Sequence, residues 1–284
     1  MSSRPAGPLA DAYIDLLRKA VLGQTVGPVT TYEPVPGQTG NRVEQHLLHR
    51  ALRRENGVLA RPETVDVAEN EDGRMTAETL PPWALTMVGA RRLENVESCV
   101  RDVLERGVPG DLIETGVWKG GTTIFMRGLL RAYGVTDRKV YVADSFQGLP
   151  PPDAEAYPAD EGSTLHLWQN LAIGLADVRA NFERFDLLDD QVEFVKGWFR
   201  DTLPALRGHV WSVIRLDGDL YESTLDALRN LYDGLAVGGW VIIDDYSDIA
   251  ACRQAVADFR AENDITEPIV EVDWTAVCWQ KQSR

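Results

Sequence analysis

Apolar side chains follow one spacing before about residue 83 and a different one after it. Residues 9–22 (LADAYIDLLRKAVL) and 43–54 (VEQHLLHRALRR) carry apolar positions at helical spacing. Residues 23–40 are rich in glycine, proline and threonine, and 58–82 are polar and interrupted by proline, so both stretches indicate loops. Because nothing in this part alternates as a β-strand does, residues 1–82 are predicted to form a helical and loop extension.

From residue 83 onward, short buried strands alternate with amphipathic helices. The predicted strands are 111–117, 139–146, 191–198, 210–219, 238–246, 269–273 and 276–282. The predicted helices are 84–106, which ends at Gly107, 122–134, 223–235 and 251–263. Strands that alternate with helices form parallel sheets, so residues 83–284 are predicted to fold as an α/β domain with a doubly wound, mostly parallel sheet. The last two strands leave little room for a crossover, which predicts a terminal hairpin with the final strand antiparallel.

Four aspartates follow two of these predicted strands. Asp217 and Asp219 lie in VIRLDGDLYEST, and Asp244 and Asp245 lie in GGWVIIDDY. Crowded carboxylates at the ends of buried strands are costly to desolvate and repel one another, and a bound divalent cation relieves both effects. An all-oxygen set suits Mg²⁺, Ca²⁺ or Mn²⁺ rather than zinc or copper. The alternative is that these residues are turn residues and helix caps.

The ends of the other predicted strands are also candidates for a ligand-binding site, because ligands of such sheets bind beyond the carboxyl ends of the strands. The first strand leads into ETGVWKGGT (114–122), whose glycines allow a ligand to approach the backbone but match neither a dinucleotide fingerprint nor a P-loop. Asp144 follows the second strand, where a carboxylate can accept hydrogen bonds from a ribose. Trp198 follows the third, where an aromatic ring can cover an adenine. Taken singly, these residues are also compatible with an ordinary turn and a core tryptophan.

Composition narrows the choice of partners. The chain has 284 residues and a formal net charge of -15, which argues against nucleic acid and against an anionic membrane surface as partners. Its three cysteines have no metal-binding spacing and indicate free thiols in a reducing compartment. We find no apolar signal segment and no apolar run of about 18 residues, so we expect a cytoplasmic protein.

The motifs resemble, in order, those of the macrocin O-methyltransferase family. The similar segments are DLIETGVWKGGTTIFMRGLL, VADSFQGLPPPD, GWFRDTLP, RLDGDLYEST and GGWVIIDDY, and the resemblance runs from about residue 81 to 284. It implies a Rossmann-like class I methyltransferase domain at 83–284 that uses S-adenosylmethionine and Mg²⁺ to methylate a sugar hydroxyl of a glycosylated natural product. It further implies a small-molecule glycoside as acceptor, a homo-oligomer, and an N-terminal part (1–82) that contributes to the acceptor site and to oligomer contacts.

The resemblance also assigns roles by position. Glu114, Gly116 and their neighbours would hold the methionine part of the cofactor, Asp144 its ribose and Trp198 its adenine, while a lead-in segment at Thr86 and Met87 closes over it. The full cofactor set is Thr86, Met87, Glu114, Thr115, Gly116, Val117, Trp118, Thr122, Asp144, Ser145, Gly197, Trp198, Phe199 and Asp217. Asp217, Asp244 and Asp245 would coordinate Mg²⁺. Asp219 would be the general base, a role that Asp217 could share.

Residues 147–190 separate the second and third predicted strands. Their first part is acidic and rich in proline, and 163–188 has a helical pattern. Loops of this length in compact domains are often lids, so we expect a lid over the site. Tyr157, His166 and Trp168 are candidates to stack on a sugar or aglycone, and His166 is a rival base; the alternative is a surface loop with a packing helix.

Two other functions compete with the sugar methyltransferase. A metal-dependent catechol-type O-methyltransferase, acting on an aromatic hydroxyl, usually has an acidic residue followed by an amide where this chain has Asp244 and Asp245. A non-enzymatic nucleotide-binding module on a similar sheet gives no reason for four acidic residues at strand ends.

Overall fold

A central seven-stranded sheet organises the computed structural model, which describes residues 7–26, 29–34, 60–65 and 80–283. The strand order is β5-β4-β3-β6-β7-β9-β8. The parallel strands are β3 (Asp111–Thr115), β4 (Val140–Asp144), β5 (Val192–Lys196), β6 (Trp211–Leu216) and β7 (Leu235–Ile243). β9 (Val277–Gln280) runs antiparallel to β7, and β8 (Val270–Glu271) runs antiparallel to β9. The predicted doubly wound, mostly parallel sheet with a terminal antiparallel pair is confirmed.

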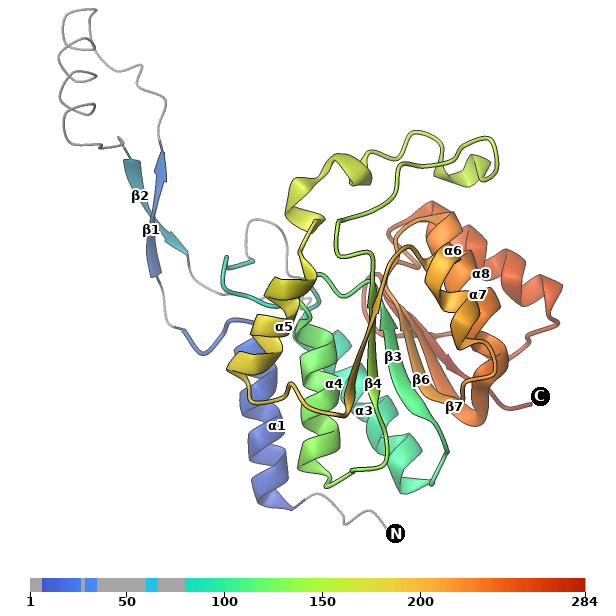
Figure 1. Ribbon diagram of the computed structural model, residues 1–284, viewed down its shortest axis with the longest axis horizontal. Helices are drawn as coiled ribbons and strands as arrows, with labels where there is room; N and C mark the ends of the chain where they lie inside the picture. Colours follow the sequence, from blue (N-terminus) through green and yellow to red (C-terminus); the bar gives the residue numbers. More distant parts are fainter. Residues whose placement is uncertain (1–6, 27–28, 35–59, 66–79, 284) are drawn as a thin grey trace, which may run out of the picture.

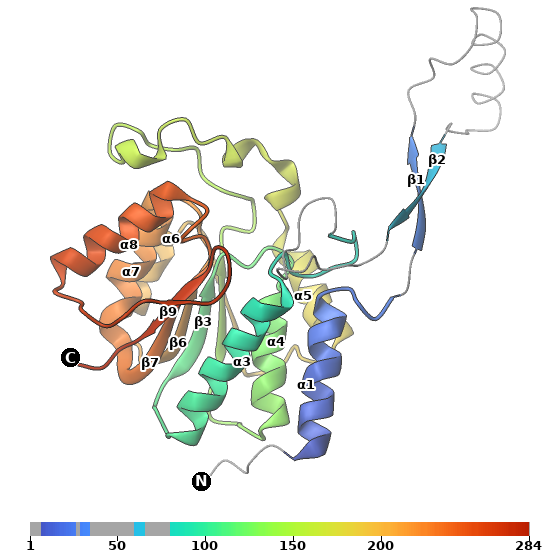
Figure 2. The same cartoon turned by 180° about the vertical axis from the view of Figure 1, so that it is seen from behind.

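Helices cover both faces of this sheet (Figures 1 and 2). One face is covered by α1 (Pro8–Val21), α3 (Ala90–Glu105), α4 (Gly121–Ala132) and α5 (Leu175–Arg184). The other is covered by α6 (Phe199–Thr202), α7 (Tyr221–Leu231) and α8 (Ala250–Glu262), with short 3-10 turns at Leu203–Leu206 and Tyr232–Gly234. Neighbouring residues of one strand, such as Leu112 and Ile113, therefore enter different cores. Burial on both faces explains why the strands are continuous apolar runs.

The N-terminal extension agrees with the prediction at one helix and differs at two strands. α1 coincides with the helix predicted over 9–22, whereas the helix predicted over 43–54 lies outside the described residues. β1 (Val29–Pro34) and β2 (Ala60–Val65) form an antiparallel pair where loops were predicted, and this pair stands apart from the main sheet (Figure 1). A two-stranded pair that is not part of a layered core need not have one apolar face, so the hydrophobic pattern of the sequence does not predict these two strands.

The helix predicted over 84–106 begins later than expected, at Ala90. Before it, the backbone of Leu85 is used by tertiary contacts: its N–H donates to the Val21 carbonyl at 2.8 Å, and its carbonyl accepts from the Gly121 N–H at 2.9 Å. A segment whose backbone groups bond to two other elements cannot also form helical hydrogen bonds. We call residues 80–89 the lead-in segment.

The insertion at 147–190 arches over the carboxyl end of the sheet before it enters α5 (Figures 1 and 2). Only α5 is α-helical in the stretch predicted to be helical over 163–188, and the rest contains 3-10 turns at Leu165–Leu167 and Gln169–Leu171. An earlier 3-10 turn spans Pro158–Asp160. Within the described ranges, no helix is long and apolar enough to cross a membrane.

Candidate active site

The register of the parallel strands brings the predicted acidic residues together. Leu216 at the end of β6 pairs with Ile243 at the end of β7, so the residues that follow lie side by side. The Asp217 N–H donates to the Thr115 carbonyl and the Asp244 N–H to the Leu216 carbonyl, each at 2.9 Å. Main-chain hydrogen bonding thus extends one residue beyond the strands and fixes both aspartates.

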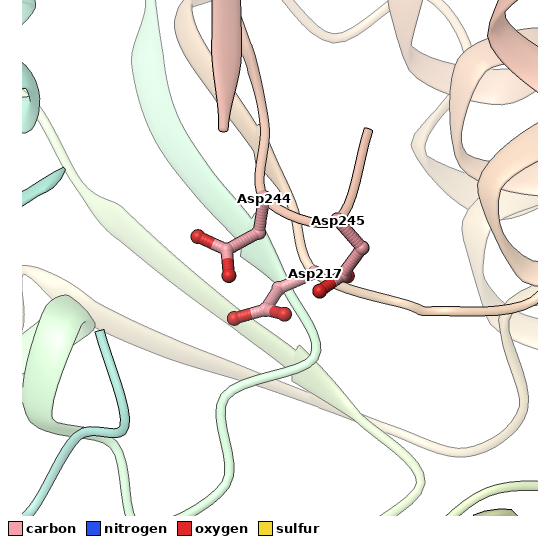
Figure 3. Close-up of side chains that lie close together, drawn as sticks. All are labelled: Asp217, Asp244 and Asp245. Carbon is pink, nitrogen blue, oxygen red and sulfur yellow. The ribbon is translucent and has the colours of Figure 1, made fainter. Parts of the chain in front are cut away.

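Three of the four aspartates form the cluster that the sequence predicted. Asp217, Asp244 and Asp245 each offer a carboxylate oxygen, and these oxygens lie within 4.8 Å of one another (Figure 3). Oδ2 of Asp245 is buried and accepts no hydrogen bond from the described residues. The oxygen donor set and this unpartnered atom fit a hard divalent cation such as Mg²⁺.

Two buried arginines, which the sequence analysis did not select, hold these carboxylates. Arg215 is fully buried; its Nη1 donates to Glu114 Oε1 at 2.5 Å and to Asp217 Oδ2 at 2.8 Å, and its Nη2 donates to Asp244. Arg92 of α3 donates to the other oxygen of Asp244. An arginine inside the apolar run of β6 is a signal that the sequence did contain, because burying a charge requires a partner.

Arg92 joins the cluster to the C-terminal hairpin. Its Nε donates to Asp273 Oδ2 at 3.0 Å, while Asp273 Oδ1 accepts the N–H groups of Thr275 and Ala276. The Thr275 hydroxyl donates to the Asp244 carbonyl at 3.0 Å. The turn between β8 and β9 therefore supports the backbone of a candidate metal ligand.

Negative charge exceeds positive charge in this cluster. The two guanidinium groups contact four carboxyl groups, those of Glu114, Asp217, Asp244 and Asp273. Two further carboxyl groups, those of Asp219 and Asp245, interact with these carboxylates. Burial, and to a smaller extent the charges of neighbouring carboxylates, raise the pKa of Asp219 to about 7. The same two causes raise the pKa of Asp245 well above its ordinary value. Burial and the charge of Asp244 raise the pKa of Asp217 to about 6, and burial raises that of Glu114 to about 8 despite its pairing with Arg215. A cation would relieve this excess.

As at Asp245, no described residue donates a hydrogen bond to the carboxylate of Asp219. It lines the open cavity beside the cluster and has a left-handed backbone with φ of 60°. Aspartate tolerates this conformation better than most residues. Its free oxygens are available to accept a proton from a bound molecule.

The open cavity has an empty volume of about 760 Å³ when counted out to solvent. Residues predicted to bind the cofactor that line it are Met87, Gly116, Trp118, Asp144, Ser145, Gly197, Trp198, Phe199 and Asp217. Others from that prediction are buried and do not line it: Thr86, Glu114, Thr115, Val117 and Thr122. Lining residues that the sequence analysis missed are Gly148, Leu149, Pro150, Leu171, Arg200, Gly218, Glu222, Ser223 and Asp226.

Contacts within the turn after β3 show what its glycine and its acidic neighbour do. A Cβ on Gly116, whose φ is 86°, would lie 1.7 Å from the Asp217 carbonyl oxygen. This glycine therefore admits the backbone of the β6 end, and it also lines the cavity. Asp144 accepts the Val117 N–H at 2.8 Å and the Phe146 N–H at 2.7 Å, so it shapes the turn as well as lining the cavity.

The same turn fastens two other segments around the cavity. Lys119 Nζ donates to the carbonyls of Pro82 at 2.8 Å and Ala84 at 3.1 Å, which secures the lead-in segment. Trp118 Nε1 donates to the Asn170 carbonyl at 2.8 Å, which secures the insertion. Neither role was predicted from the sequence.

The aromatic candidates of the insertion lie outside the cavity lining. The Tyr157 ring lies 5.9 Å from the Tyr221 ring, and Trp168 is 53% exposed. His166, the rival base, is not among the described residues that line the cavity, whereas Asp219 is. The geometry therefore favours the strand-end aspartate for proton transfer.

Known proteins are similar to this chain in sequence and in fold. The chain is 54% identical over 216 residues to the 8-demethyl-8-(2,3-dimethoxy-alpha-L-rhamnosyl)-tetracenomycin-C 4'-O-methyltransferase of Streptomyces olivaceus, covering 76% of this chain and 82% of that protein. It is 48% identical over 217 residues to the demethyldecarbamoylnovobiocin O-methyltransferase of Streptomyces niveus, covering 76% and 83%. The solved structure of the O-methyltransferase NovP matches with a TM-score of 0.80 at 40% identity, over 96% of this chain and 100% of that chain.

The fold is therefore the Rossmann-like class I methyltransferase fold. The family of macrocin-O-methyltransferases (TylF) matches residues 10–281. On this match and these relatives, the chain belongs to the macrocin-O-methyltransferase family.

Proposed function

We propose that this protein is an S-adenosylmethionine-dependent and Mg²⁺-dependent O-methyltransferase that acts on a sugar hydroxyl of a glycosylated natural product. The observation that carries the proposal is the free carboxylate of Asp219 on the cavity wall, beside the cluster of Asp217, Asp244 and Asp245. The relative from Streptomyces olivaceus is named for a rhamnosyl tetracenomycin, and the relative from Streptomyces niveus for demethyldecarbamoylnovobiocin. Both names support a small molecule as acceptor, and the rhamnosyl group in the first supports a glycoside.

Residues from three strand ends would bind the cofactor. Asp144 would accept hydrogen bonds from the ribose, Trp198 and Phe199 would flank the adenine, and Gly116 and Met87 would border the methionine part. The predicted residues that do not line the cavity would act behind it. Thr86 and Thr122, for example, join the lead-in segment to α4 through hydroxyl groups 3.2 Å apart.

Asp217, Asp244 and Asp245 would hold Mg²⁺. When bound, the ion would supply the Lewis acidity that lowers the pKa of a coordinated hydroxyl. Arg215 and Arg92 keep two of these carboxylates in place, since Arg215 contacts Asp217 and Asp244, and Arg92 contacts Asp244.

Asp219 would accept the proton from the acceptor hydroxyl. Burial and the charges of Asp217 and Asp244 raise its pKa to about 7, and a general base works best when its pKa lies near the operating pH. Asp217 could share this role, but one of its oxygens already accepts from Arg215. Methyl transfer itself requires in-line placement of sulfur, carbon and oxygen, which is a task for the residues that orient the two substrates.

We also infer a role for the parts of the chain that surround this site. The insertion at 147–190 would act as a lid, because Leu149, Pro150 and Leu171 line the cavity. Residues 1–82 would contribute to the acceptor site and to contacts in a homo-oligomer, which light scattering on the purified protein would test. The three cysteines are free and buried, which supports a cytoplasmic enzyme.

The test is a panel of glycosylated natural products incubated with S-adenosylmethionine and Mg²⁺ and analysed by mass spectrometry. We expect a product that carries one additional methyl group on the sugar, and about 10²- to 10⁴-fold slower formation of this product with Asp219→Asn. Methylation of a catechol but of no glycoside would favour the catechol-type alternative. Tight binding of S-adenosylhomocysteine without transfer to any acceptor class would favour the non-enzymatic module.

A further inference from the structure

A buried carboxylate in the insertion contacts the catalytic part of the domain. Asp160 is 1% exposed and ends the 3-10 turn Pro158–Asp160. Its Oδ1 accepts the N–H of Tyr221 at 2.7 Å, and its Oδ2 accepts the N–H of Glu222 at 3.0 Å. These are the first two residues of α7, so Asp160 caps a helix that is 61 residues away in sequence.

α7 depends on this distant cap because it has none of its own. The residue at its N-cap position is Leu220, whose side chain makes no capping hydrogen bond. The first N–H groups of a helix have no partner within the helix, and a carboxylate at this end also interacts favourably with the helix dipole. The insertion thus supplies an acceptor that the local sequence lacks.

The capped end of α7 continues directly from the candidate base. The Leu220 N–H donates to the Gly218 carbonyl at 2.6 Å, and the Thr224 N–H donates to the Leu220 carbonyl at 3.0 Å, so a tight turn joins Asp219 to the helix. On the other side, the Asp217 N–H is bonded to the Thr115 carbonyl of β3. The position of Asp219 is therefore determined between a fixed strand end and the start of α7.

The insertion holds Asp160 in a defined local structure. The Asp160 N–H donates to the Tyr157 carbonyl at 3.0 Å, and the Asp160 carbonyl accepts from the Ser163 N–H at 3.1 Å. The contact between the rings of Tyr157 and Tyr221 covers the same junction. This part of the insertion is consequently an anchor on α7 rather than a free loop.

We propose that Asp160 is a positioning residue for proton transfer: by capping α7, it holds Asp219 in its left-handed conformation on the cavity wall. The proposal rests on the proposed function in one respect, that Asp219 is the base. A misplacement of about 1 Å in a reacting group costs on the order of 100-fold in rate. Asp160 contacts backbone groups only, so it would act on the rate without binding either substrate.

The experiment is a double-mutant cycle of Asp160→Asn with Asp219→Asn. Asparagine has nearly the shape of aspartate but presents an amide N–H₂ to one of the two backbone donors. We expect kcat of Asp160→Asn to fall by about 10- to 100-fold, while the KM for S-adenosylmethionine and the Kd for S-adenosylhomocysteine change less than about threefold. In the Asp219→Asn background the same substitution should lower kcat by less than about threefold, because it acts through Asp219.

The matched control is Asp153→Asn, in the same insertion, which removes the charge of an exposed carboxylate that accepts the Ala156 N–H and should leave kcat unchanged. If Asp160→Asn fails to fold, Asp160→Ser, which keeps one capping oxygen, takes its place in the cycle with the same expectations. Wild-type kcat in the Asp160 variant, or an undiminished effect in the Asp219→Asn background, overturns the positioning role. Near-normal kcat in Asp219→Asn would instead contradict the assignment of the base in the proposed function.

Discussion

Replacement of Asp219 by asparagine should change activity and stability in opposite directions. The substitution keeps the shape of the side chain and removes its charge and its capacity to accept a proton. The Asp219 carboxylate lines the cavity and accepts no hydrogen bond from the described residues, so little of the surrounding structure depends on it. A residue with a purely structural role would lose activity and stability together.

The expected loss of activity follows from the role of a general base. Removal of such a base lowers kcat by about 10²- to 10⁴-fold, which corresponds to roughly 3–5 kcal/mol of barrier. Binding of S-adenosylhomocysteine is the appropriate control measurement, because its sulfur carries no positive charge that the lost carboxylate would attract. We expect its Kd to change less than about threefold, and the residual activity to rise with pH.

The expected gain in stability follows from the raised pKa of Asp219. Its pKa in the folded protein is about 7, against an ordinary value of 3.8, so between these values the folded state binds more protons than the unfolded state. The free energy of unfolding therefore falls as the pH rises from about 4 to 7. At 1.36 kcal/mol per pKa unit the upper limit is about 4 kcal/mol. Because the side chain borders an open cavity, water screens it, and we expect a gain of about 1–2 kcal/mol for Asp219→Asn at pH 8.

Thermal or urea unfolding at pH 8 and at pH 4, both with a chelator, measures this gain, which should vanish at the lower pH. Asp248→Asn is the matched control, because Asp248 is an exposed carboxylate that also raises the pKa of Asp219 but does not line the cavity. Near-normal kcat in Asp219→Asn would refute its role as base. A loss of stability at pH 8 would refute the charge argument.

Three further variants test the metal, the cofactor and the lead-in segment. Asp245→Asn should weaken Mn²⁺ binding at least about tenfold in calorimetry, since Asp245 has an unpartnered buried oxygen. A chelator should abolish wild-type turnover until Mg²⁺ is restored, and full turnover in excess chelator contradicts the metal role. Asp144→Ala should weaken binding of S-adenosylhomocysteine by about 1.5–3 kcal/mol, and an unchanged affinity would place the ribose elsewhere. Lys119→Met should raise the Kd for S-adenosylhomocysteine about three- to tenfold by releasing the lead-in segment, whereas the exposed control Lys139→Met should not. Equal effects of the two substitutions would show that Lys119 is not needed to hold the lead-in segment.

Hydrophobic pattern was sufficient to predict the central sheet. Strands that are buried on both faces must be apolar along their whole length, and the helices between them must present one apolar face. Strands such as β6 and β7 could therefore be located from composition and spacing. Their parallel arrangement then implied that Asp217 and Asp244 lie together, because the carboxyl ends of parallel strands meet at one edge of the sheet.

The hydrophobic pattern gave a wrong prediction for two segments, the lead-in segment and the β1–β2 pair. The lead-in segment has a helical sequence, yet its backbone bonds to Val21 and Gly121, and α3 begins only at Ala90. The β1–β2 pair lies outside the layered core and leaves no periodic signal. In both cases the deciding contacts join residues that are distant in sequence.

The sequence by itself determined the fold class, the order of the strands along the chain and the acidic strand ends, because burial on both faces leaves a periodic record. Only the tertiary structure decided which groups neutralise those acids and which segments hold them. Arg92 reaches Asp273 across 181 positions of sequence, and Asp160 caps α7 across 61. Such pairings depend on the path of the folded chain, and a charged residue looks the same in sequence whether it faces water or a buried partner.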